Sequence, residues 1–452
     1  MFNDPASRII KSSGSFMRTF LLLSLFSSVL LQPAFAEDLL EIYRLAQKSD
    51  PTYRAAQQEF FAVEESKNQS FALFLPVLGL SANYNDINRE SKTVGTSTDY
   101  TSQGYSLTLS QAIYHNDYFV QYRQADYQVA QAAANFNSSA LDLIVRVSTA
   151  YFEVLGAIDN LTFSEAELKA IGEQLHQTKQ RFKVGLTAIT DVHEAQSRYD
   201  QSNAQTIAAK NLLAVSRENL REVTGQYPQS LSELAKDTPL VKPDPADIEQ
   251  WAKIAADQSL ILIAADKAMQ IAREEVNRRR SGHYPTLDLV ASKGYTKDDG
   301  PLSQQFNATE IDDTRIGLVL NLPIYQGGLV LSQTDEAAYR YQQSKEVYEQ
   351  QRRATDRQTR SSYLNVIANI SSVIAFKQAL LSTRTALEAT QAGYEVGTRT
   401  AVDLLNSRRE VFRAERDYAR SRYTYIVETL RLKQAAGTLT EDSVIAINQW
   451  LK

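Results

Sequence analysis

Apolar and polar side chains alternate along four short stretches of the chain, which is the period of a β-strand with one apolar and one polar face. Leucine, isoleucine, alanine and tyrosine fill most of one face, and serine, threonine, asparagine and aspartate fill much of the other. Polar stretches at about 88–103 and 298–301 separate the members of each pair, and we expect them to be loops. The predicted strands cover residues 78–85, 105–113, 287–292 and 316–324.

Helical periodicity fills most of the remaining chain. Proline breaks helices, and none occurs between Val77 and Tyr227 or after Pro323, so very long helices are allowed. A narrow apolar seam at 141–155 indicates that the long helices contact each other as in coiled coils. The predicted helices run over 38–73, 115–182, 187–223, 248–280, 329–394 and 399–436, and the hairpin turns lie at 184–186 and 396–398.

The two halves of the chain repeat each other. RFKVGLTAITD at 181–191 returns as GYEVGTRTAVD at 393–403, an offset of 212 residues. We therefore predict two structural repeats, 37–246 and 247–452, each with a helix, two strands and a helical hairpin, joined by a proline-rich linker. Offsets of 209 to 212 relate further pairs: Asp38 and Asp247, Pro76 and Pro285, Tyr114 and Tyr325, Tyr151 and Tyr363, Gly225 and Gly437.

The N-terminus has the order of a secretory signal peptide. Three basic residues precede an apolar run at 20–31, and Ala34-Phe35-Ala36 follows as a cleavage site. We predict that residues 1–36 are removed; an uncleaved anchor is the alternative, and either Met1 or Met17 is the start. Elsewhere we expect no stretch to approach the ~20 apolar residues of a membrane helix.

Composition excludes several classes of function. The chain has 48 basic and 53 acidic residues, a net charge of −5 that becomes −7 without the leader, so it is a poor nucleic-acid binder. It has no cysteine, so packing must supply its stability. Its four histidines lack metal-ligand spacing, and it carries no P-loop or GxSxG motif. We expect no enzyme activity, catalytic residue, cofactor or metal site.

Four strands with one apolar face need a cover for that face. A small sheet covered by helices of a soluble protein is one possibility, but the apolar seams of these helices are narrow and already used. Lipid is the simpler cover. An open sheet edge in lipid is costly, so several chains must share one barrel: two chains give eight strands, whereas three give twelve and room for water. Five tyrosines near the strand ends fit an interfacial girdle or are scattered surface residues: Tyr84, Tyr105, Tyr114, Tyr295 and Tyr325.

Five segments together resemble the TolC family of outer-membrane efflux and type I secretion channels: LPVLGLSANY, YPTLDLVAS, LNLPIYQGG, RFKVGLTAITDV and AGYEVGTRTAVDLL. The resemblance covers essentially all of the mature chain. It implies an α+β membrane protein of a Gram-negative outer membrane, a homotrimer whose twelve-stranded β-barrel continues into a long α-helical coiled-coil barrel in the periplasm. It also implies a periplasmic membrane-fusion adaptor and an inner-membrane transporter of the RND or ABC type as partners.

The same resemblance assigns roles at the hairpin turns. Thr190, Asp191, Tyr394 and Arg399 match the polar network that closes the periplasmic entrance of such ducts, in which guanidinium, carboxylate and hydroxyl groups pair. Asp403 matches an entrance carboxylate ring, and Asn406 stands where many members carry a second aspartate. The residues that match adaptor-docking turns are Val184, Gly185, Leu186, Val396, Gly397 and Thr398.

Simpler structural roles compete with these assignments. Asp191 with Glu194, and Thr400 with Asp403, both have the spacing of a helix capping box. The glycines of the two turns fit a turn that needs a left-handed residue. For the whole chain, the competing hypothesis is an exported coiled-coil scaffold or adhesin with a soluble β head. The sequence does not identify the exported substrates, the cognate pump or the strength of cation selection.

Overall fold

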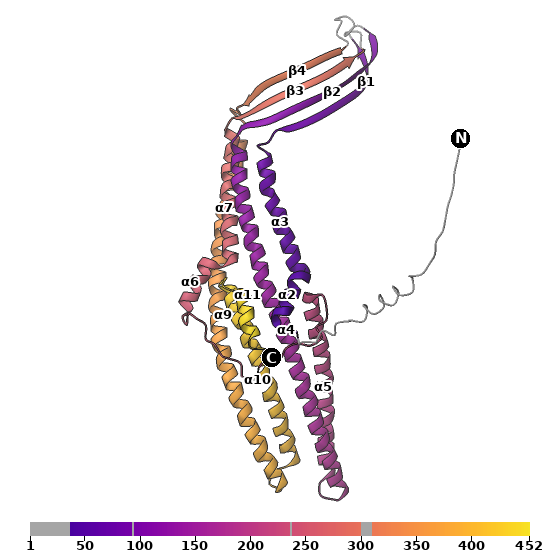
Figure 1. Ribbon diagram of the computed structural model, residues 1–452, viewed down its shortest axis with the longest axis vertical. Helices are drawn as coiled ribbons and strands as arrows, with labels where there is room; N and C mark the ends of the chain where they lie inside the picture. Colours follow the sequence, from indigo (N-terminus) through magenta and orange to yellow (C-terminus); the bar gives the residue numbers. More distant parts are fainter. Residues whose placement is uncertain (1–36, 93–94, 236, 300–309) are drawn as a thin grey trace, which may run out of the picture.

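The computed structural model describes residues 37–452 except 93–94, 236 and 300–309, so the predicted signal peptide lies outside the described residues. The molecule is elongated, with a four-stranded sheet at one end and two helical hairpins that reach to the other end (Figure 1). Long helices beside an antiparallel sheet confirm the predicted α+β class.

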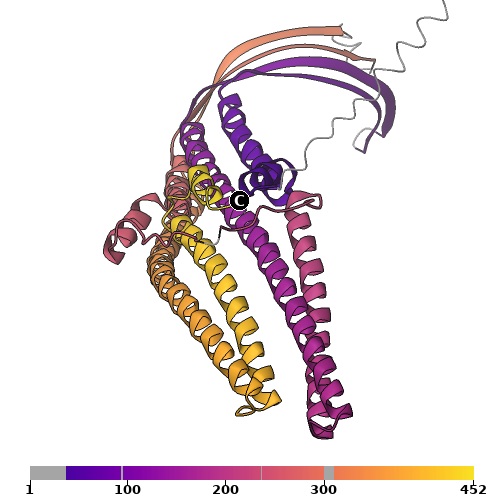
Figure 2. The same cartoon turned by 60° about the horizontal axis from the view of Figure 1, so that its bottom comes forward.

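The sheet is antiparallel with the strand order β1-β2-β3-β4, formed by Val77–Ser91, Thr96–His115, Thr286–Asp298 and Glu310–Asn321. Its register places apolar residues opposite one another across all four strands. Leu80 pairs with Leu107, and Leu289 pairs with Leu318. Because side chains alternate between faces, these pairs lie on one apolar face, as the alternation predicts. β1 and β4 form its two edges, and the sheet curves as a whole (Figure 2).

The strands extend beyond the predicted limits. The predicted loop at 88–103 is wrong for most of its length, since Asn88 pairs with Asp99 and the β1–β2 ladder continues to Ser91 and Thr96. The apolar alternation stops in this region although the backbone ladder continues, because both faces there are polar. In the second half, β4 ends at Asn321, ahead of the predicted 324, because Pro323 has no N–H to donate to a ladder.

Two long hairpins confirm the predicted coiled-coil segments. α4 (Asn116–Lys183) pairs with α5 (Ile189–Thr224), and α9 (Leu329–Glu395) pairs with α10 (Ala401–Ala435). The chain bends into α9 at Gly327 and Gly328, which have φ of 61° and 82°, where a side chain would be strained. A short helix, α11 (Glu441–Asn448), follows near the C-terminus.

Two helices predicted as continuous are each broken in two. α2 (Leu39–Ser49) and α3 (Pro51–Ala72) meet at Asp50, and α6 (Ile248–Gln258) and α7 (Leu260–Arg280) meet at Ser259. Asp50 and Ser259 both have extended backbones, with ψ of 117° and 118°. They are 209 residues apart, which is within the 209 to 212 offset that relates the two halves, so the same break occurs in each half. In the first half the cause is local: the Asp50 side chain accepts from the Tyr53 N–H and Pro51 begins α3.

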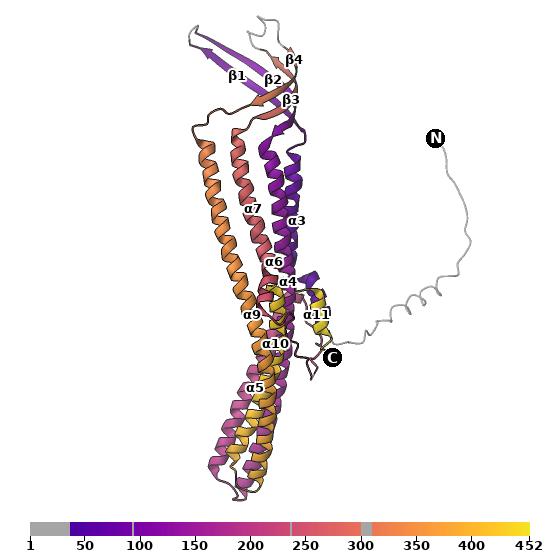
Figure 3. The ribbon, with the colours of Figure 1, turned by 90° about the vertical axis from the view of Figure 1, so that its left-hand side faces the viewer.

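The helices form a layer whose order differs between its two ends. Nearer the sheet, α3 packs on α4, α4 on α7 and α7 on α9 (Figure 3). Nearer the hairpin tips, α5 packs on α4, α4 on α10 and α10 on α9. Each chain is thus a strip with one edge formed by β1, α3 and α5 and the other by β4 and α9.

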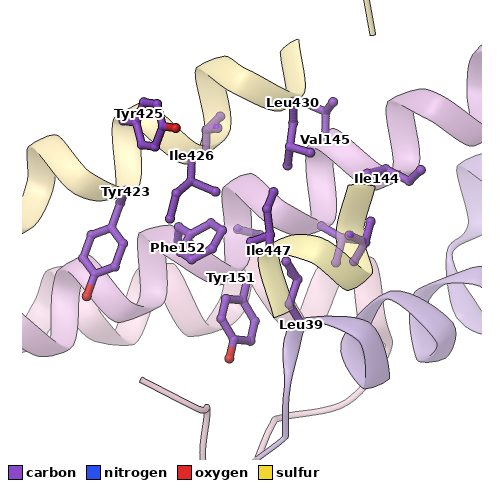
Figure 4. Packing of buried hydrophobic residues seen from close by; sticks show 14 of the residues in the cluster. Leu39, Ile144, Val145, Tyr151, Phe152, Tyr423, Tyr425, Ile426, Leu430 and Ile447 are labelled. Carbon is purple, nitrogen blue, oxygen red and sulfur yellow. The ribbon is translucent and has the colours of Figure 1, made fainter. Parts of the chain in front are cut away.

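The main hydrophobic core lies at mid-height, where short elements wrap the long helices. Phe152 of α4 lies beside Ile426 of α10, whereas Tyr151 points the other way, toward the linker between residues 225 and 247 (Figure 4). The buried Tyr151 hydroxyl donates to the Ser232 carbonyl at 2.8 Å, which attaches the linker between the halves to this core. The predicted seam of α4 at 141–155 is confirmed here, because Leu141 packs against this core and the other seam residues are buried: Ile144, Val145, Ser148, Tyr151, Phe152 and Leu155.

The expectation that no stretch after the leader resembles a membrane helix is wrong, because α9 is long and apolar enough to do so. α9 contains an 18-residue window with mean hydropathy 1.4, although only 22% of that window is buried. Exposed side chains such as Leu364, Ile374 and Leu381 contribute to this value. α9 therefore has an apolar surface that the single chain leaves open.

Candidate functional site

The two hairpin turns lie side by side at the end of the molecule farthest from the sheet (Figures 1 and 2). Gly185 and Gly397 have φ of 76° and 80°, so each turn itself requires glycine. Val184, Leu186 and Val396 are 70%, 68% and 75% exposed. The predicted docking residues therefore include apolar side chains that point into solvent at both tips.

A polar contact joins the two hairpins at this end. Arg181, in the last turn of α4, donates from Nη1 to the Tyr394 hydroxyl of α9 at 2.8 Å. Its guanidinium carbon also lies 5.3 Å from the centre of the Tyr394 ring. The family resemblance assigns Tyr394 to the closing network, but no sequence signal points to Arg181, because the two residues are 213 positions apart.

The other predicted network residues are not joined within one chain. Asp191 accepts a hydrogen bond from the Thr187 hydroxyl, and Thr190 is exposed in the first turn of α5. Arg399 is exposed after the second turn, where its N–H donates to the Gly393 carbonyl. The predicted pairing of Arg399 with Asp191 therefore stays a prediction about contacts between chains. The capping box proposed for Asp191 and Glu194 is wrong, because Ala188 occupies the N-cap of α5 and makes no side-chain cap.

The capping box of Thr400 and Asp403 is confirmed. Asp403 accepts from the Thr400 N–H at 3.0 Å and from its hydroxyl at 2.8 Å, while the Asp403 N–H donates to the Thr400 oxygen. The pKa of Asp403 lies below its usual value. The largest cause is the hydrogen bond from the Thr400 backbone, and the Thr400 hydroxyl and the nearby Arg399 lower the pKa further. Asp403 is therefore ionised at neutral pH, and Asn406 lies one turn further along α10. The entrance carboxylate ring stays a prediction.

At the opposite end, the apolar face of the sheet has no cover. Leu80, Leu318 and Leu320 are 74%, 67% and 67% exposed. Within the described part of the chain, no helix packs across either face of the sheet (Figure 3). The alternative of a soluble β head half-buried by helices needs such a layer, so the structure contradicts it.

The comparisons with known proteins identify the family. A family model described as "Outer membrane efflux protein" matches residues 42–226 and 251–438. The chain is 38% identical over 418 residues to the outer membrane protein TolC of Vibrio cholerae, covering 92% of this chain and 94% of that protein. This chain belongs to the TolC family of outer membrane efflux proteins. It is accordingly an outer-membrane channel protein.

Other relatives in this family of outer membrane efflux proteins are named for secretion or for efflux. The proteases secretion protein PrtF of Dickeya chrysanthemi is 29% identical over 429 residues, covering 93% of this chain and 92% of that protein. The CmeC outer membrane channel of Campylobacter jejuni shares the fold, with a TM-score of 0.77 at 16% identity over 92% of this chain and 90% of that one.

Proposed function

We propose that this chain is one protomer of a homotrimeric outer-membrane exit duct that serves efflux, type I secretion or both, and acts as a passive conduit without a catalytic step. The observation that carries the proposal is an uncovered apolar sheet with two open edges, attached to a strip of long helices. An inner-membrane transporter and a periplasmic adaptor would deliver the substrate, and the adaptor would dock at the exposed hairpin turns. The two repeats, 37–246 and 247–452, would supply equivalent parts of the wall.

Ring closure follows from the two edges of the strip. Unpaired backbone groups on β1 and β4 are too costly to leave open in lipid, so β1 of one chain pairs with β4 of the next. The helical edges match this arrangement, since Phe61 of α3 and Ile207 of α5 are exposed on one edge and Leu364 and Ile374 of α9 are exposed on the other. Head-to-tail contacts of this kind form a closed ring when the rotation allows it, and three copies give twelve strands.

The spacing of the tyrosines supports a membrane position for the sheet. Tyr105 of β2 stands opposite Tyr295 of β3, with ring centres 5.5 Å apart, and Tyr114 lies nine residues further along β2. A register shift between Ala112 and Tyr114 pairs Tyr114 with Leu287 and so places it on the same apolar face. Nine residues span about 30 Å along a strand, or about 23 Å along the membrane normal at the roughly 40° tilt of membrane barrels. That height suits the ~25 Å apolar band of an outer-membrane barrel, so the tyrosines are proposed to lie at its two interfaces.

The hairpin tips would form the gate. Asp191 lies in the first turn of α5, and Arg399 lies just before α10, so both are near the tips. They do not contact each other within the described chain, so they are available to pair across chain boundaries. An exposed polar link contributes about 0 to 1 kcal/mol, and three copies total a few kcal/mol. A docked partner can offset this by burying a few hundred Å² of apolar surface at roughly 25 cal/mol per Å².

Breaking the gate links is expected to widen the resting channel. Asp191→Ala and Arg399→Ala each remove a link in all three chains, so we expect the single-channel conductance in a planar bilayer to rise at least about twofold. Unchanged conductance in both variants would remove these residues from the gate.

Restoring the second carboxylate should strengthen cation selection. Asn406→Asp adds three charges at the entrance, each worth about 1 kcal/mol toward a cation at ~4 Å in water, or roughly a fivefold change in affinity. We expect block by a trivalent cation to tighten at least by that factor, with Asn406→Ala as the uncharged control. Equal block of both variants would place Asn406 away from the narrow entrance.

The protomer proposal is tested by the purified mature chain. We expect it to require detergent, to migrate as a trimer in unheated SDS, and to form channels in planar bilayers. A detergent-independent monomer that forms no channels would contradict the proposal.

A further inference from the structure

Contacts between the two hairpins follow a series from mid-height to the tips. The buried Glu167 of α4 accepts from Arg416 of α10 at 3.0 Å, and Arg408 donates to the Ala170 carbonyl at 3.3 Å. Lower down, Leu405 of α10 packs among Ile171 and Leu175 of α4. These contacts are buried or partly buried, so they hold α4 against α10.

The last contact in this series differs in character. Arg181 and Tyr394 join α4 to the end of α9 through one hydrogen bond and a cation–π contact, in an exposed place. Exposed links of this kind are weak and break readily, unlike a buried ion pair. The contact therefore lies where the two hairpins can separate without opening the core above it.

The internal repeat shows that Arg181 is specialised. Its counterpart at an offset of 212 is Gly393, and a Cβ placed there would lie 2.8 Å from Arg399 Cγ and 3.1 Å from Thr398 Oγ1. In the second hairpin, the Arg399 side chain lies over its own turn, against Gly393. A side chain at position 393 would clash with it, so glycine is required there. In the first hairpin that position carries the arginine that reaches the neighbouring hairpin.

We propose that Arg181 is a positioning residue of the gate, which holds Tyr394 from within the same chain. A tyrosine hydroxyl can accept one hydrogen bond and donate another. Because Arg181 donates to the oxygen, the Tyr394 proton is left for a carboxylate of a neighbouring chain, and Asp191 is the carboxylate that the proposed gate offers. This inference rests on the proposed function, since it adds a residue to the same gate.

The test compares two basic residues in one helical turn. Lys183 also lies in the last turn of α4, so Arg181→Ala and Lys183→Ala remove the same charge near the entrance. Purified trimers of each variant are measured in planar bilayers, with trimer formation checked in unheated SDS. We expect Arg181→Ala to raise conductance about two- to fivefold, the effect of losing one exposed link in each chain, and Lys183→Ala to leave it near the wild-type value.

Two further variants distinguish positioning from a general charge effect. Tyr394→Phe removes only the hydroxyl, and adding Arg181→Ala to it should raise conductance by less than Arg181→Ala does alone. Arg181→Lys keeps a donor and the charge, so its conductance should lie between those of the wild type and Arg181→Ala. Equal conductance of the Arg181→Ala and Lys183→Ala trimers would overturn the role of Arg181 even if Asp191→Ala opens the channel. Wild-type trimers that form no channel would instead overturn the proposed function.

Discussion

Gly437→Ala is expected to destabilise the protein by about 2–5 kcal/mol per chain, whereas Gly225→Ala should cost about 1–2 kcal/mol. The two glycines are counterparts at an offset of 212, and both have left-handed backbones, with φ of 74° and 76°. Each follows the second helix of a hairpin and abuts the helix break of its own half. The strain of a left-handed alanine is therefore common to both variants.

The difference comes from what a methyl group would meet. At Gly437 a Cβ would lie 2.2 Å from the Gln258 carbonyl oxygen and 2.7 Å from its carbon, and backbone atoms at a helix end cannot turn aside. At Gly225 the nearest atom is the Ser49 Cβ at 3.4 Å, which is close to an ordinary contact. The temperature at which SDS-resistant trimers dissociate gives the order of stability. Equal losses of stability in the two variants would show that the backbone around Gln258 moves to accommodate a methyl group, which would contradict this account.

Asp50→Ala is expected to cost about 2–4 kcal/mol per chain, because it removes a helix cap and a nearly buried ion-pair partner together. Asp50 is 2% exposed, accepts from the Tyr53 N–H at 3.0 Å and pairs with Arg146 at 2.6 Å. Asp142→Ala removes the other partner of Arg146, an exposed carboxylate, and should cost less than about 1 kcal/mol. Thermal dissociation of the trimers compares the variants, and similar losses would contradict the buried role of Asp50.

The contribution of Asp50 to the free energy of unfolding should also disappear at acid pH. Burial raises the pKa of this carboxyl, but Arg146 and the Tyr53 N–H lower it by more, so its folded pKa lies below the usual value. Its stabilisation is then complete above the unfolded pKa of about 3.9 and is lost as the pH falls through the lower folded pKa. The stability difference between wild type and Asp50→Ala should therefore narrow below about pH 4.

The parts of the fold that follow from local pattern were predictable. α4 and α9 extend over long stretches without proline, and their 3.6-residue period leaves no alternative element of that length. The apolar parts of the strands were found for the same reason. The paired but polar continuation at Asn88 and Asp99 was not, because period two is visible only where one face is apolar. Asp50-Pro51 did carry a helix-start signal, but the helical period continues across it.

The candidate site was predictable only in part. The turn glycines and the tip residues follow from the repeated segments and the family resemblance. The contact of Arg181 with Tyr394 joins positions 213 apart and depends on the two hairpins ending at the same height, which no local pattern encodes. The attachment of Tyr151 to Ser232 likewise depends on how the linker crosses the helices.

Cysteine crosslinking between β1 and β4 tests the central claim most directly, that each chain is one section of a ring closed edge to edge. The chain has no cysteine, so introduced pairs are unambiguous. Leu80→Cys on the apolar face of β1 would be combined in turn with Ile316→Cys, Leu318→Cys and Leu320→Cys on the same face of β4, and oxidised in outer-membrane vesicles. We predict that at least one pair gives a covalent trimer and nothing larger, while Leu80→Cys alone gives none. Chains that stay monomeric with all three pairs would contradict the account.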